Sequence, residues 1–96
     1  MRTGVVYTRA GTAHLELRPG RYRLYAGRGM EWSVASEMID LAEGDNKAVQ
    51  MELTREVDTR GWVAVDSHIH TLTHSRHGDA TIAERAITIA GEGIEL

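Results

Sequence analysis

Histidines are concentrated in one short stretch of this 96-residue chain: four of its five, His68, His70, His74 and His77, lie within ten residues. On an extended backbone alternate side chains point the same way, so Asp66, His68 and His70 share one side. Neutral imidazole is a common ligand of divalent metals, and a neighbouring carboxylate can contribute an oxygen. The spacing therefore predicts a divalent metal site (zinc, manganese or iron) with His68 and His70 as ligands.

The other histidines have alternative roles. An H-x-H pair alone is a weak signal, and a polar loop with fortuitous histidines is the simplest alternative. A preceding aspartate, an apolar run before it and a capped helix after it make the signal stronger. His74 and His77 are expected at the surface or supporting the ligands, and His14 on an exposed strand.

The residues around the histidines predict an alternation of strand and helix. Trp62–Val65 is a continuous apolar run, typical of a strand covered on both faces in a parallel sheet. Thr81 and Glu84 have the spacing of a capping box, and the helix that follows should stop near Gly91 and Gly93. Ile94–Leu96 would open another strand. We therefore expect residues 59–96 to form the first β-α unit of a (β/α) barrel, which places functional residues after the strand.

The first half of the chain has a different pattern. Short runs of alternating hydrophobicity are separated by turn residues, which is typical of antiparallel sheets with one wet face. Tyr22, Leu24 and Ala26 share one face of such a run. The other expected strands are Val5–Tyr7, His14–Leu17, Trp32–Val34 continuing through Met38–Leu41, and Val49–Leu53. Residues 1–58 are therefore predicted to form a mainly-β domain, an incomplete β-sandwich.

The metal-site residues carry a family resemblance. The segment Val65-Asp66-Ser67-His68-Ile69-His70-Thr71, followed by Gly78-Asp79-Ala80-Thr81-Ile82 and a helix, resembles the first motif of PHP (polymerase and histidinol phosphatase) metallohydrolases. The resemblance implies that His68 and His70 bind metal, that Asp66 is a buried carboxylate and that Asp79 is an acidic loop ligand. Ser67 and Gly78-Asp79-Ala80 depart from the family pattern, so His77 could replace Asp79.

A second resemblance concerns the predicted sandwich. Leu17-Arg18-Pro19-Gly20-Arg21-Tyr22, with Gly27-Arg28-Gly29 after it, is similar to a segment of carboxypeptidase-regulatory-like sandwiches. Such a sandwich precedes the metal domain in some bacterial PHP proteins of the carbaryl-hydrolase-like group. The alternative is an ordinary hairpin whose Pro-Gly pair makes the turn.

These patterns predict a fragment of a metal-dependent hydrolase acting on a small-molecule substrate, with a phosphoester as first expectation and an ester or carbamate as second. An amidohydrolase-superfamily fragment and a non-catalytic β-sandwich binding module are the alternatives. The ligands present do not complete a catalytic set, so we expect the isolated chain to be inactive.

Composition limits the partners of this chain. It has 11 Lys+Arg against 14 Asp+Glu, a net charge of −3, and no cysteine. A nucleic acid or an anionic membrane usually requires a concentrated basic face, so neither is expected as a partner. A disulfide framework and a thiolate metal site are excluded. Open strand edges favour a homo-oligomer, and the compartment stays undetermined.

Overall fold

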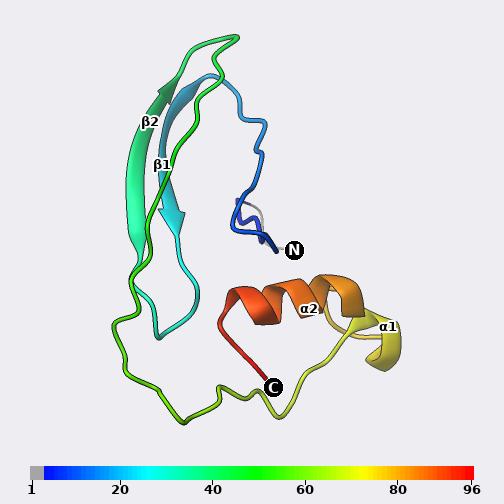
Figure 1. Cartoon of the computed structure of the whole chain (residues 1–96). Coiled ribbons are helices and arrows are strands. Elements are labelled where there is room, and N and C mark those ends of the chain that lie inside the picture. Colours follow the sequence, from blue (N-terminus) through cyan, green and yellow to red (C-terminus); the bar gives the residue numbers. More distant parts are fainter. Residues whose placement is uncertain (1–3) are drawn as a thin grey trace.

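The computed structural model describes residues 4–96; residues 1–3, which belong to the predicted first domain, lie outside the described range. Within that range the chain forms two strands and then two helices. The strands make an upright hairpin, and the longer helix extends sideways from beside its lower end (Figure 1). The segment before the first strand rises from above this helix to the top of the hairpin (Figure 1). His68 and His70 lie in the segment that leads to the first helix, His74 lies within that helix, and His77 lies between the two helices.

The hairpin consists of β1 (Gly20–Ala26) and β2 (Ala35–Leu41), paired antiparallel. Along β1, Tyr22, Leu24 and Ala26 are half-buried while the residues between them are exposed, which confirms the predicted alternation. Arg21 lies opposite Asp40, and its Nε donates to the carboxylate at 2.9 Å. Opposite-charge pairs of this kind across two strands add to the stability of an antiparallel ribbon.

The helices are α1 (Leu72–Ser75) and α2 (Ile82–Gly91). The predicted capping box is confirmed: the Thr81 side chain accepts from the Glu84 amide, and the Glu84 carboxylate accepts from the Thr81 amide at 2.9 Å. Gly91 is the last helical residue, as the sequence indicates. The single turn of α1 is not predicted by the sequence; Thr71 caps it by accepting from the His74 amide.

The predicted fold class is wrong. Residues 4–96 contain two antiparallel strands and two short helices, neither a mainly-β sandwich nor a β-α unit of a barrel. The runs at residues 5–7, 14–17 and 49–53 form no strand, because alternation marks a face without supplying a hydrogen-bonding partner. Trp62, predicted to lie in a buried strand, is 80% exposed.

Two sets of backbone contacts position the helical part of the chain. One joins the segments on either side of the helices, and the other places the hairpin loop against the end of α2. The Glu95 amide donates to the Ala64 carbonyl at 2.9 Å, and the Asp66 amide donates to the Leu96 carbonyl at 3.1 Å. These bonds join the segment before the histidines to the segment after α2, although neither segment is a strand. At the foot of the hairpin, a side chain at Gly29 would collide with the Glu92 carbonyl, so the hairpin loop lies directly against the end of α2.

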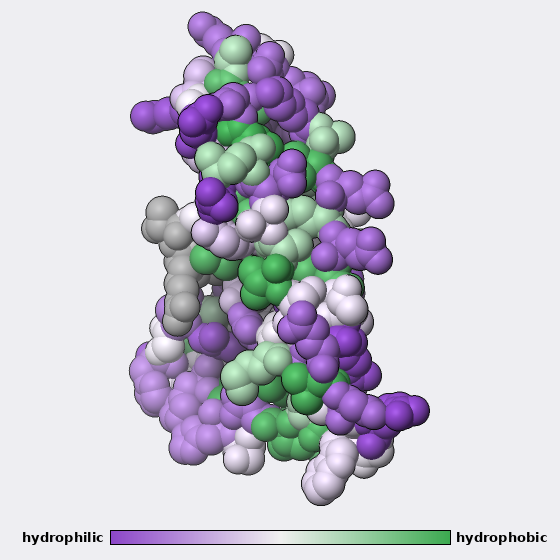
Figure 2. Space-filling view, turned by 90° about the vertical axis from the view of Figure 1, so that its left-hand side faces the viewer, coloured by the Kyte–Doolittle hydropathy of each residue, from purple (hydrophilic) through white to green (hydrophobic). Residues whose placement is uncertain are grey.

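The described part of the molecule is open and has little core. Ala80 is buried at 3% exposure and Thr71 at 9%, and all other described residues are more exposed. Figure 2 shows hydrophobic groups interspersed with hydrophilic ones across the visible face. No helix among residues 4–96 has the length and apolar character needed to cross a bilayer.

Candidate metal centre

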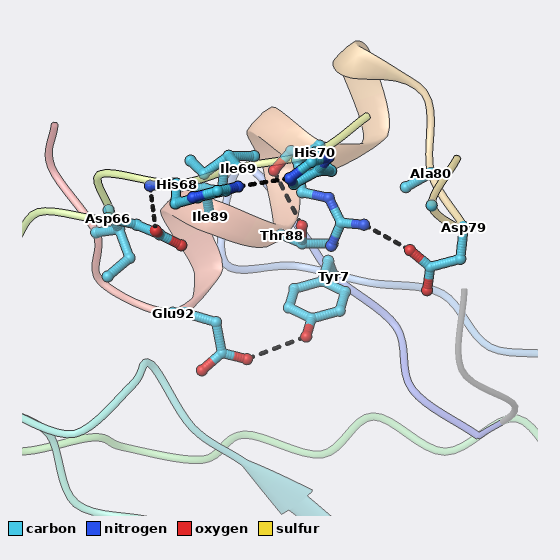
Figure 3. Close-up of a pocket in the computed structure, with 13 residues that line it drawn as sticks. Tyr7, Asp66, His68, Ile69, His70, Asp79, Ala80, Thr88, Ile89 and Glu92 are labelled. Carbon is cyan, nitrogen blue, oxygen red and sulfur yellow. Dashed lines mark hydrogen bonds and ion pairs between the residues drawn. The ribbon is translucent and has the colours of Figure 1, made fainter. Parts of the chain in front are cut away.

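The segment that carries Asp66, His68 and His70 is extended and anchored at its start by the contact of Asp66 with Leu96. The Asp66 Oδ1 atom accepts from the His68 amide at 3.1 Å, which turns this carboxylate back on its own backbone. Figure 3 shows this contact beside the two imidazole rings. Asp66 is exposed, whereas the resemblance to the PHP motif implies a buried carboxylate.

His68 and His70 meet as their spacing predicts. Their Nε2 atoms are 2.6 Å apart, and the rings stack with centroids 4.7 Å apart and planes inclined by 22° (Figure 3). A contact between two ring nitrogens requires one to carry a proton and the other to offer a lone pair. The two Nε2 atoms therefore face each other across a short hydrogen bond.

His77 joins this pair from the opposite side of a loop. Its ring centroid lies 4.5 Å from that of His70, with the planes inclined by 35°. The Ser75 hydroxyl donates to the His77 carbonyl at 2.9 Å, and Arg76 adopts a left-handed conformation (φ 58°) that reverses the chain after α1. His74 lies within α1 and is exposed. Of the two additional histidines, His77 is the one that the loop brings to the ligand pair.

Asp79 is held by an arginine. Its Oδ1 atom lies 2.5 Å from Nη2 of Arg85, and Arg85 holds the pKa of the Asp79 carboxyl below its usual value, chiefly through this hydrogen bond. Arg85 lies on the first turn of α2, just after the capping box. Asp79 is thus already engaged in an ion pair with Arg85.

A cavity of about 570 Å³ opens beside the histidine pair. Its walls come from the histidine segment, the loop at Asp79 and one face of α2: Arg85, Thr88, Ile89 and Glu92 follow the i, i+3, i+4, i+7 spacing of a helix face. Tyr7 closes another side; its hydroxyl donates to Glu92 Oε1 at 3.0 Å (Figure 3).

The sequence does not identify three of these cavity residues. Tyr7 and Glu92 are 85 positions apart, and nothing local in either segment indicates that they meet. Arg85 could have been found only from its spacing with Thr88, Ile89 and Glu92, a mixed face that a search for apolar periodicity passes over.

Few of the candidate metal ligands are directed at one common position. Among residues 4–96, no group of three or more His, Asp or Glu side chains is arranged to hold one ion. His68 and His70 supply two nitrogens, His77 lies against the second ring, and Asp79 is turned to Arg85. The described chain therefore offers a two-nitrogen half-site.

Comparisons with known proteins give no relative: no protein-family profile, no curated protein and no solved structure matches this chain. The geometry of the cavity and the chemistry of its residues are therefore the basis for a functional argument.

Proposed function

We propose that His68 and His70 hold a divalent transition-metal ion that serves a hydrolytic reaction. The observation that supports this proposal is the approach of their Nε2 atoms to 2.6 Å at the wall of a cavity. Converging lone pairs of two neutral imidazoles are a binding site for zinc, iron or manganese.

The histidine pair fits such an ion. Imidazole nitrogens lie about 2.0–2.1 Å from a tetrahedral zinc ion, so two nitrogens on one ion are separated by about 3.3 Å. The pair would have to open by about 0.7 Å from its 2.6 Å separation to hold such an ion. Both Nε2 atoms must offer lone pairs to the cation, so each neutral ring would carry its proton on Nδ1.

The surrounding residues support a hydrolytic role. A bound divalent ion lowers the pKa of a coordinated water and polarises a carbonyl or phosphoryl oxygen. Asp66 fixes the backbone of His68, and the His77 ring limits the movement of His70. The cavity of about 570 Å³ is within the size range of small-molecule sites.

The resemblance of this segment to the PHP motif makes a phosphoester the first substrate class, with an ester or carbamate as the alternative. Catalytic zinc sites usually have three protein ligands. A hydrolytic centre built on this pair therefore needs at least one ligand more than His68 and His70. We expect the 96-residue chain alone to bind metal weakly and to be inactive.

Calorimetric titration with zinc tests the ligand assignment. The chain should bind one equivalent, and the double variant His68→Ala/His70→Ala should lose that binding. His14→Ala is the matched control, because His14 is a lone exposed histidine outside the cavity. Equal zinc binding by the double variant and the control would overturn the assignment.

Turnover tests the reaction class. In a protein that presents this segment together with the remaining ligands, metal-dependent hydrolysis of p-nitrophenyl phosphate should disappear when both histidines are replaced. Retained hydrolysis would show that another site performs the reaction.

A further inference from the structure

Arg85 is the one cationic side chain, Lys or Arg, that lines the cavity among the described residues. It lies on the first turn of α2 and faces the same space as His68 and His70. Its side chain is 28% exposed, which is low for this open molecule. By comparison, the ion-paired Arg21 on β1 is 72% exposed. Arg85 therefore has the position of a group that a cavity ligand would meet.

The hydrogen bonds of Arg85 are incomplete. Nη2 contacts Asp79 at 2.5 Å, whereas Nε is buried and has no hydrogen-bond partner among residues 4–96. A buried charged donor without an acceptor is costly, and such groups in proteins often mark a binding or catalytic role. Asp79 itself remains 67% exposed, so the carboxylate does not account for the burial of the guanidinium.

We propose that Arg85 binds an oxyanion of the substrate through the guanidinium N–H groups that Asp79 does not occupy, with Asp79 as the positioning residue that orients the guanidinium. The planar guanidinium presents its N–H groups in a fork that matches the oxygens of a phosphoryl group or a carboxylate. The Asp79 contact engages Nη2 and leaves Nη1 for the ligand, whereas the buried Nε could take part only after the atoms that cover it move.

This subsite rests on the proposed function, because the charge of the cavity opposes an anion in the absence of a metal ion. Three carboxylates line the cavity, those of Asp66, Asp79 and Glu92, against the single positive charge of Arg85. A divalent cation on His68 and His70 would offset this surplus. Oxyanion binding at Arg85 is therefore expected to require metal.

The experiment uses the full chain saturated with zinc and follows the Nε–H resonance of Arg85 during titration with inorganic phosphate. Acetate in a parallel titration separates a phosphoryl preference from a carboxylate preference. The resonance should shift on addition of phosphate, and omission of zinc should abolish the shift. Calorimetry of the same titration gives the affinity.

Three variants make the test specific. Arg85→Gln should weaken phosphate binding by about tenfold or more, since it removes a charge-assisted hydrogen bond. Arg85→Lys keeps the charge and guards against misfolding of the first variant; it should also bind more weakly, because an ammonium lacks the fork. Arg21→Gln, which removes an ion-paired arginine outside the cavity, should bind as the parent does.

The outcomes separate the two proposals. Unchanged zinc affinity in Arg85→Gln with reduced phosphate affinity supports the subsite. Equal phosphate affinity in the parent, Arg85→Gln and Arg85→Lys overturns the subsite and leaves the metal proposal intact. Failure of the parent chain to bind zinc overturns the proposed function, and the subsite that rests on it falls as well.

Discussion

The contacts at the histidine cluster depend on the local backbone to different degrees. His68 and His70 approach each other because alternate residues of one extended segment share a side. His77 reaches His70 only through the turn of α1 and the left-handed residue Arg76. Asp79 lies two residues further on, and its carboxylate faces Arg85. These placements make His77 a stronger candidate than Asp79 for an additional metal ligand.

We predict that His77 contributes more to metal binding than Asp79 does. The His77 ring already lies against His70, whereas a metal ion would have to draw Asp79 away from Arg85. Zinc titration should therefore show a larger loss of affinity for His77→Ala than for Asp79→Asn. The reverse order would make Asp79 the additional ligand, as the PHP resemblance implies.

Sequence reasoning finds groups whose relation is local and misses those that meet through the fold. The convergence of His68 and His70 follows from spacing alone. The partnership of Asp79 with Arg85 does not, because one residue lies in a loop and the other on a helix. Asp66, expected as a buried carboxylate, is exposed because the described chain places no layer over it.

At the scale of elements, α2 shows how a predicted helix can present an unpredicted face. Its capping box and its end follow from local chemistry, and both are confirmed. Ile82, Ala86, Ile89 and Ala90 have the spacing of an apolar helix face. Of these, Ile89 lines the cavity beside Arg85 and Thr88, whereas the other three are exposed. Helical periodicity identifies residues that share a side, but the neighbouring segments decide which side is covered.

The acidic groups at the start of α2 predict a loss of helix in acid. The backbone amide of Thr81, followed by its hydroxyl, holds the pKa of Glu84 below its ordinary value of 4.5. A carboxyl whose pKa is lower in the folded state stabilises that state above its unfolded pKa, and the stabilisation is lost as the pH falls through the folded pKa. Helical circular dichroism should therefore decrease as the pH falls below about 4.5.

Glu84→Gln provides the control for this acid transition. Glutamine can still accept the hydrogen bond from the Thr81 amide but does not titrate. Its helix signal should change less with pH than that of the parent chain, with Asp79 accounting for the remaining dependence. Identical acid titrations of the two proteins would exclude Glu84 as a source of the effect.

The first half of the chain shows that alternating hydrophobicity alone does not predict a strand. Val49, Met51 and Leu53 are half-buried and alternate with exposed residues as expected, but their segment forms no strand. A strand exists only where a second backbone supplies donors and acceptors at the correct register. The hairpin satisfies that condition between β1 and β2.

At the scale of the whole molecule, the exposed surface is larger than a folded domain of this size requires. Its accessible surface is 8267 Å², whereas about 5,500 Å² is typical for this mass. The radius of gyration is 15.9 Å, against about 12.5 Å for a compact chain of this length. The surplus exceeds the roughly 800 Å² that one partner contributes to a standard protein interface.

This surplus predicts association or low stability in isolation. Exposed apolar side chains such as Val34 and Tyr25, at 68% and 69%, gain free energy when another surface covers them. Sedimentation should show mass increasing with protein concentration, and the melting temperature should rise with it. A strictly monomeric chain with a sharp, concentration-independent transition would contradict this prediction.

The loop that carries His77 has a consequence for the order of folding. The hydrogen bond that closes this loop, from the Ile82 amide to Thr73 Oγ1, spans 9 residues. The contact between Tyr7 and Glu92 that closes the cavity spans 85 residues. Closing the longer span costs about 2 kcal/mol more in chain entropy. The loop and the start of α2 should therefore form first, and the Tyr7 wall last. The Asp66 amide bonds to the Leu96 carbonyl, which also closes a longer span than the Ile82 bond. Pulsed hydrogen exchange should therefore protect the Ile82 amide before the Asp66 amide, with the loop assembled before the cavity around it is closed.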